Sequence, residues 1–218
     1  MDIHQIEVAL NSPNSNERLK ALTELRHYNP EVAVPLLTSK LQDPEFVVRS
    51  FVAMGLGKKQ TDASFSALLN LMKSDRDPNV RAEAANSLSL FGPVAASHLI
   101  ESFQQDEHWL LRRSILAALM DMEYPEALFD VCIYGLVDKD LTVKWAAIDG
   151  LSYLAGSGKQ NDALQQLLAL ADSEEWRIRW RVARSLSRFD EPQARDALNR
   201  LKQDEDHRVV GAALESLL

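Results

Sequence analysis

The stretch that decides the fold is DPNVRAEAANSL, residues 77–88. Its apolar side chains recur at the spacing of one helix face, and they are Val80, Ala84, Ala85 and Leu88. Aspartate followed by proline, here Asp77 and Pro78, is a typical helix start, because the carboxylate caps the first turn and proline suits its first position. The stretch therefore predicts a helix with one buried stripe.

The same pattern occurs seven times along the chain. Counterparts of RAEAANSL start at residues 18, 49, 112, 144, 179 and 210, so successive copies are 31 to 35 residues apart. A repeat of this period indicates stacked units that bury their apolar faces on one another. Each copy ends in a leucine that we predict to be buried: Leu25, Leu56, Leu88, Leu119, Leu151, Leu186 and Leu217.

A second amphipathic helix precedes each copy, as Phe65, Leu68, Leu69 and Met72 show by their helical spacing. No segment has the two-residue period of a strand. We therefore predict an all-α fold, a right-handed α-solenoid of seven helix pairs that forms a single domain over residues 1–218. The second helices of the pairs are predicted near residues 16–26, 45–57, 78–91, 108–120, 141–155, 174–188 and 207–217.

The period and the signature D-x-x-V-R, seen at residues 77–81, resemble the HEAT repeat. More narrowly, the chain resembles the HEAT-like repeat family of phycobilisome lyases, nearest its short, NblB-like members implicated in phycobilisome degradation in cyanobacteria. The resemblance covers essentially the whole chain. It implies second helices that line a concave face, and an activity that attaches open-chain tetrapyrroles to phycobiliproteins or detaches them. Because this repeat occurs in many scaffolds, the resemblance is more specific for fold than for function.

Composition narrows the setting and the partners. The 218 residues carry a net charge of −8, which opposes phosphate binding, so we expect no nucleic-acid partner. No apolar run approaches the roughly 20 residues of a membrane span, and the N-terminus lacks the features of a signal peptide. The single cysteine, Cys132, excludes an internal disulfide. We expect a soluble, cytoplasmic protein with no membrane partner.

Helix geometry separates scaffold positions from surface positions. We number each copy from its first residue, offset 0, which is Arg81 in the stretch above. Offset 0 lies about 35° from the centre of the apolar stripe, so its basic side chains point partly into the interface between repeats. We predict that they bond to capping acids of the neighbouring repeat and are structural. They are Arg18, Arg49, Arg81, Arg112, Lys144 and Arg179.

Offsets +1 and +5 point about 135° and 175° away from the stripe. Two consecutive repeats carry tryptophan at offset +1, Trp145 and Trp180, and one turn later they carry Asp149 and Arg184. The resemblance places these positions in the concave groove. Two alternatives stay open: the tryptophans form an exposed anchor surface, or twist of the solenoid buries them under neighbouring loops.

Candidate site residues follow from this sorting. The predicted ligand-binding residues are Trp145, Asp149, Trp180, Arg184, Arg113, Arg181, Trp176 and Trp109. No catalytic residue can be named. The five histidines lack metal-site spacing, so we expect no metal and no required cofactor. Residues 156–159, Gly-Ser-Gly-Lys, resemble part of a phosphate loop, but a turn is expected because the rest of that motif is missing.

Two functions compete. The resemblance implies the handling of a bilin such as phycocyanobilin, free or on phycobiliprotein subunits. The tryptophans would stack on its rings, Asp149 would accept pyrrole N–H bonds, and Arg113, Arg181 or Arg184 would hold its propionates. Detachment, attachment and pure binding all stay open. The alternative is a non-enzymatic adaptor that anchors a protein partner on the same groove residues. A third class, HEAT-like DNA glycosylases, also uses groove tryptophans, but the negative charge argues against it.

Overall fold

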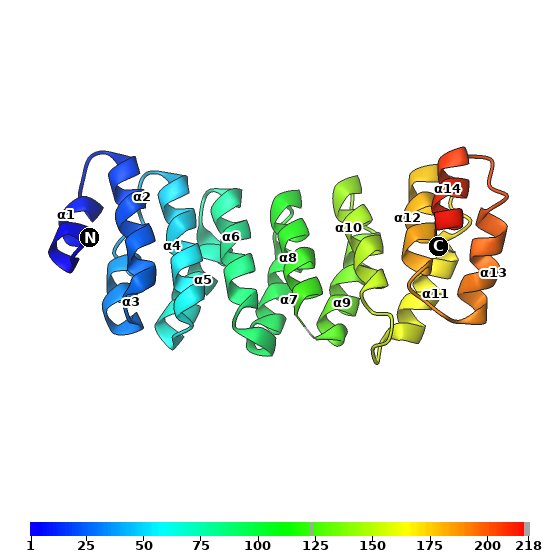
Figure 1. Cartoon of the computed structure of the whole chain (residues 1–218), viewed down its shortest axis with the longest axis horizontal. Helices are drawn as coiled ribbons and strands as arrows, with labels where there is room; N and C mark the ends of the chain where they lie inside the picture. The colour runs from blue at the N-terminus through cyan, green and yellow to red at the C-terminus, as the bar shows by residue number, and fades with distance from the viewer. Residues whose placement is uncertain (123, 216–218) are drawn as a thin grey trace. The chain divides into compact units, whose positions relative to one another are not determined.

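The computed structural model describes residues 1–122 and 124–215 (Figure 1). Within these residues the chain forms fourteen α-helices and two short 3-10 helices, and it contains no strand. The elements are α1 (Ile3–Leu10), α2 (Ser15–Glu24), η1 (Leu25–His27), α3 (Pro30–Thr38), α4 (Phe46–Lys59), α5 (Asp62–Ser74), α6 (Pro78–Ser89), η2 (Gly92–Ala95), α7 (Ala96–Gln105), α8 (Trp109–Asp121), α9 (Pro125–Leu136), α10 (Leu141–Ser152), α11 (Gln160–Leu170), α12 (Trp176–Leu186), α13 (Pro192–Leu201) and α14 (His207–Glu215). The predicted all-α solenoid of seven helix pairs is confirmed.

The contacts within the chain group it into two compact units, Met1–Ala118 and Leu119–Leu218. In the first unit the second helices α2, α4 and α6 pack side by side, and in the second unit α10, α12 and α14 do the same. This packing brings outward side chains from neighbouring repeats onto one surface within each unit. Over the described residues, no helix combines the length and the apolar character that crossing a membrane requires.

Six of the seven leucines that end the copies are described by the structure, and all six are buried, as predicted. They run from Leu25 to Leu186 and are at most 1% exposed. Leu217 lies outside the described residues. Burial at the same position of these six repeats means that their second helices share one register of the apolar stripe.

Helix starts follow the predicted capping chemistry with one correction. Asp77 and Asp140 are the N-caps of α6 and α10, and their side chains accept backbone N–H bonds from the first turn. Asp43-Pro44 has the same aspartate–proline sequence as Asp77-Pro78, which predicts that Asp43 caps the next helix, and this is wrong: α4 begins at Phe46 and its N-cap is Glu45. The Asp43 carboxylate is buried, pairs with an arginine of the preceding repeat and accepts the N–H of Glu45.

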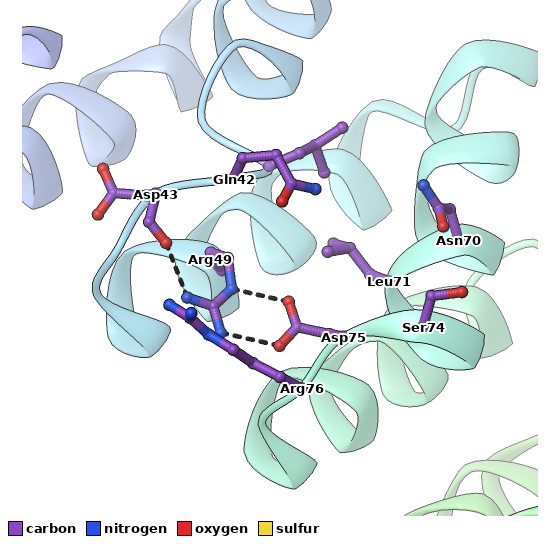
Figure 2. A pocket seen from close by; sticks show the side chains of 9 residues that line it. Gln42, Asp43, Arg49, Asn70, Leu71, Ser74, Asp75 and Arg76 are labelled. Atoms are coloured by element: carbon purple, nitrogen blue, oxygen red, sulfur yellow. Dashed lines mark hydrogen bonds and ion pairs between the residues drawn. The ribbon is translucent and has the colours of Figure 1, made fainter.

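Arginines at offset 0 link one repeat to the next, as predicted, and Arg49 shows how (Figure 2). Its Nε and Nη2 donate to both carboxylate oxygens of Asp75, at 2.7 and 2.8 Å, and Nη1 donates to the Asp43 carbonyl at 2.7 Å. Figure 2 draws the side chains that line a pocket of about 200 Å³ around this ion pair. Because Arg49 and Asp75 already bond each other, a structural role is enough to explain why they lie there. The same link recurs in the pairs Arg18–Asp43, Arg81–Asp106 and Arg179–Asp204.

The acidic partners are not the capping residues that we predicted. Asp75 lies two residues before the N-cap Asp77, and its Oδ1 accepts the Asp77 N–H at 2.9 Å. Lys144 also departs from the prediction, because its ammonium makes no hydrogen bond or ion pair with a described residue. An ammonium lacks the planar fork with which a guanidinium reaches a carboxylate and a carbonyl together.

Candidate functional site

The outward positions are placed as their offsets predict, with one exception. At offset +5, Thr23, Met54, Asn86, Ala117, Arg184 and Glu215 are exposed and Asp149 is half-buried. At offset +1, Ala82 is buried, against prediction. The helices α4 and α6 are neighbours, and near their ends a Cβ on Gly57 would lie only 2.7 Å from the Ser87 Cβ.

Three of the predicted tryptophans meet at one pocket of the unit Leu119–Leu218. The pocket encloses about 360 Å³, and it is lined by Trp145 of α10, by Trp176, Arg177, Trp180 and Arg181 of α12, and by Arg208 of α14. These side chains share the pocket because α10, α12 and α14 are neighbours. We call these six residues, together with Asp149 and Arg184, the Trp–Arg cluster.

Arg181 occupies the centre of the Trp–Arg cluster. Its guanidinium carbon lies 4.9 Å from the ring centroid of Trp145 and 5.6 Å from that of Trp180. Its Nη1 donates to Asp149 Oδ2 at 2.6 Å, which joins α12 to α10. A cation near two indoles and bonded to a carboxylate is favourable, so Arg181 is held at this place by three contacts.

Trp176 lines the same pocket and has two arginines over its ring. The guanidinium carbons of Arg208 and Arg177 lie 3.3 and 4.6 Å from its ring centroid. Arg208 also donates from Nε and Nη2 to the two carboxylate oxygens of Asp206. This hydrogen bonding holds the pKa of Asp206 well below its ordinary value, so the carboxylate stays charged and keeps Arg208 directed at the indole.

Two arginines of α12 retain their full donor capacity. Arg184 lies over the Trp180 ring at 4.9 Å, and Arg177 lies over Trp176, but neither guanidinium makes a hydrogen bond or ion pair with a described residue. Both are exposed. Seven residues separate them, so they lie on one face of α12, about 10 Å apart along its axis. Two unpaired guanidiniums beside indole faces are suited to an anionic aromatic ligand.

Two further polar groups of the cluster are incompletely bonded. The Trp145 Nε1 is buried and has no hydrogen-bond partner among the described residues. Asp149 uses Oδ2 for Arg181, and its side chain remains 46% exposed. The predicted role of Asp149 as a ligand acceptor therefore competes with its ion pair. Trp145, Trp176 and Trp180 are each half-buried, and an arginine guanidinium lies over the ring of each.

The other two predicted residues, Trp109 and Arg113, belong to the unit Met1–Ala118. Arg113 lies 5.8 Å from the Trp109 ring centroid, and His108 stacks on the same indole at 6.0 Å. Within this unit they form an arginine–indole pair of the same kind as those of the Trp–Arg cluster.

Sequence reasoning missed Arg177 and Arg208 as pocket residues. Both stand at offset −2 of adjacent repeats. Comparing the same offset in neighbouring repeats, which selected Trp145 and Trp180, could therefore have identified them. Burial raises the pKa of the Cys132 thiol, which keeps it protonated, and residues 156–159 form turns before α11. No group of three or more His, Cys, Asp or Glu within the described residues is arranged to hold a metal ion.

The repeats define the class of protein. The model of the family described as HEAT repeats matches residues 4–89, 34–120 and 129–218, so the chain belongs to the HEAT-repeat family. Among curated proteins, deoxyhypusine hydroxylase of Danio rerio is 30% identical over 109 residues, which cover 50% of this chain and 36% of that protein. The chain therefore spans little more than a third of the length of that relative.

Two solved structures share the fold over nearly the whole chain. The complex of CpcE and CpcF of phycocyanin lyase from Nostoc sp. PCC7120 matches with a TM-score of 0.56 at 19% identity, covering 100% of this chain and 95% of that one. Human deoxyhypusine hydroxylase in complex with glycerol matches with a TM-score of 0.50 at 18% identity, covering 99% and 94%. Identities this low show the fold alone, so function has to be argued from the site.

Proposed function

We propose that the protein binds an open-chain tetrapyrrole, phycocyanobilin or a related bilin, in the Trp–Arg cluster, and so handles the chromophore as it leaves or joins a phycobiliprotein subunit. The observation that carries this proposal is the pocket itself, where three indoles and three guanidiniums converge from three neighbouring helices. The likeness to the CpcE–CpcF complex, a phycocyanin lyase, is consistent with the proposal at the level of the fold.

The chemistry of a bilin complements the cluster group by group. A bilin is flat and conjugated, and it carries two propionates and several pyrrole N–H donors. Arg177 and Arg184 have no acidic partner to give up, so they supply the donors for the carboxylates. The indole of Trp180 supplies a stacking surface, and Asp149 accepts pyrrole N–H bonds through the oxygen that Arg181 does not use.

Arg181 limits how deeply a bilin can enter the Trp–Arg cluster. Its guanidinium lies where a ring would stack against Trp145, so a bilin that enters there has to displace it or stack on its plane. Its ion pair with Asp149 is broken or weakened in the first case. The proposal therefore favours a ligand whose carboxylates replace Asp149 as the partner of Arg181.

The test is an absorbance titration of the protein with free phycocyanobilin and with holo-phycocyanin. A stacking or cation–π contact contributes about 0.5–2 kcal/mol, so Trp180→Ala and Arg184→Ala should each weaken binding about 2- to 30-fold. Asp149→Asn should shift the bound absorption, because it changes the partner of the pyrrole N–H groups, and it should ease the displacement of Arg181, whose ion pair it removes.

Arg188→Ala is the matched control, since Arg188 also lies over an aromatic ring, that of Tyr153 at 4.9 Å, but outside the pocket. Its affinity should equal that of the wild type, and far-ultraviolet circular dichroism should be the same for all variants. Equal binding by wild type, Trp180→Ala, Arg184→Ala and Asp149→Asn would reject the pocket. If the wild type binds neither probe, the adaptor becomes the better account, with the cluster as the anchor of a protein partner.

A further inference from the structure

The helix α4 exposes large apolar side chains on the face that points away from the core. Phe46, Val47 and Met54 are 40%, 38% and 38% exposed, and Phe51 is half-buried. The four side chains lie within an arc of about 140° and extend about 12 Å along the helix. The opposite face already buries its own apolar stripe, so the exposed stripe is not needed for packing against the repeats.

A pocket adjoins this stripe between α2 and α4. It encloses about 180 Å³, and Leu22, Leu25 and Leu37 contribute apolar lining, with Phe51 and Met54 on the side of α4. All of these residues belong to the unit Met1–Ala118. The volume suits one apolar side chain of a partner, inserted between the two helices.

The edge of the pocket is basic. Arg26, Lys58 and Lys59 line it, and none of the described lining residues is acidic. Lys59 donates to the carbonyls of Arg26 and Tyr28, which fixes its ammonium in place. Lys58 is exposed and makes no hydrogen bond or ion pair with a described residue, so its charge is available. In a chain of net charge −8, this local excess of positive charge selects an acidic partner.

We propose that the surface formed by this pocket and the exposed stripe of α4, the α2–α4 surface, binds an acidic amphipathic helix of a partner protein. One apolar side chain of that helix enters the pocket, its apolar face covers the stripe, and its carboxylates pair with Arg26 and Lys58. A helix fits because the stripe runs along more than two helical turns, which matches anchors spaced at i, i+4 and i+7. This surface is independent of the Trp–Arg cluster and of the bilin proposal.

The probe is a dye-labelled amphipathic helical peptide with leucines on one face and glutamates on the other, followed by fluorescence anisotropy. A twin peptide with lysine in place of glutamate tests the charge requirement. Met54→Asp should weaken binding of the glutamate peptide at least about tenfold, and Lys58→Glu about threefold. Asn86→Asp is the matched control, because Asn86 is exposed at the same offset of α6, and it should bind like the wild type.

Both test positions are exposed, so the variants should keep the helical content and melting temperature of the wild type. Equal binding of the lysine twin, or wild-type affinity in Met54→Asp, would overturn the proposal, and so would the absence of any binding of the glutamate peptide.

Two other occupants are tested in parallel. Self-association abolished by Met54→Asp would identify a second copy of the chain, and sedimentation with phosphatidylcholine–phosphatidylserine vesicles would identify a membrane surface; either result overturns the helix. Met54→Asp should leave the phycocyanobilin titration unchanged, which separates the two proposals.

Discussion

Replacing Arg49 with alanine should destabilise the protein by about 3 kcal/mol, because the change leaves a buried carboxylate without its partner. The two side chains of the Arg49–Asp75 pair are only 4% and 5% exposed, and both guanidinium–carboxylate bonds would be lost. Removing one partner of a buried ion pair costs about 3–5 kcal/mol. Both residues of the pair line a pocket of about 200 Å³ (Figure 2), and we expect the cost at the lower end because a pocket of this size leaves room to resolvate the carboxylate once the Arg49 side chain is removed.

The assay is urea unfolding followed by circular dichroism, with thermal melting as a second measure. For a chain of this length, about 3 kcal/mol corresponds to a loss of roughly 6–12 °C in melting temperature. Lys73→Ala is the control: the Lys73–Glu101 pair has the same 2.7 Å separation as Arg49–Asp75, but its side chains are 38% and 43% exposed. An exposed pair contributes about 0–1 kcal/mol, so this variant should melt close to the wild type.

A double variant distinguishes two causes of instability in Arg49→Ala: the unpaired charge of Asp75 and the lost packing of the Arg49 side chain. Arg49→Met with Asp75→Leu replaces the pair by apolar side chains, and it should recover most of the stability that Arg49→Ala loses. The reasoning would be refuted if Lys73→Ala cost as much as Arg49→Ala, since burial would then not set the magnitude. It would also fail if the double variant were no more stable than the single one.

The hydrogen bond from Arg179 lowers the pKa of Asp204, against the opposing effect of burial. The pair therefore contributes its full stability at pH values above the ordinary pKa of an aspartate, and this stability is lost as the pH falls through the lowered pKa. The urea midpoint should therefore drop as the pH falls below the ordinary aspartate pKa of about 4, and it should drop less in Arg179→Gln. Gly57→Ala should cost about 1–3 kcal/mol in urea unfolding, because its new methyl group meets the Ser87 Cβ at 2.7 Å, and adding Ser87→Gly should recover part of this cost, since only the Ser87 Cα, at 3.1 Å, then remains close. Cys132 is completely buried with a raised thiol pKa, so Ellman's reagent should label it rapidly in urea and far more slowly in the folded protein; equal rates would show that its helix opens readily.

The repeat period and the terminal leucine of each copy were sufficient to predict the helices and their buried faces. That success has a local cause: an apolar stripe at helical spacing has to be covered, and each repeat supplies the cover for its neighbour. The direction of the arginines at offset 0 followed from the same geometry. Their acidic partners did not, because Asp75 and its equivalents stand before the cap in turns whose shape no helical period describes.

The offsets also predicted that Trp145 and Trp180 point away from the core, and the structure places both at one pocket with Trp176. Only the tertiary structure brought Arg208 to Trp176, joined Arg181 to Asp149 and placed Trp109 in the other unit. The direction of a side chain from its own helix depends on φ, ψ and residue spacing, which the sequence encodes locally. The partner that it meets depends on how close neighbouring helices pack and which rotamer fills the space between them, and those are decided by the whole set of contacts.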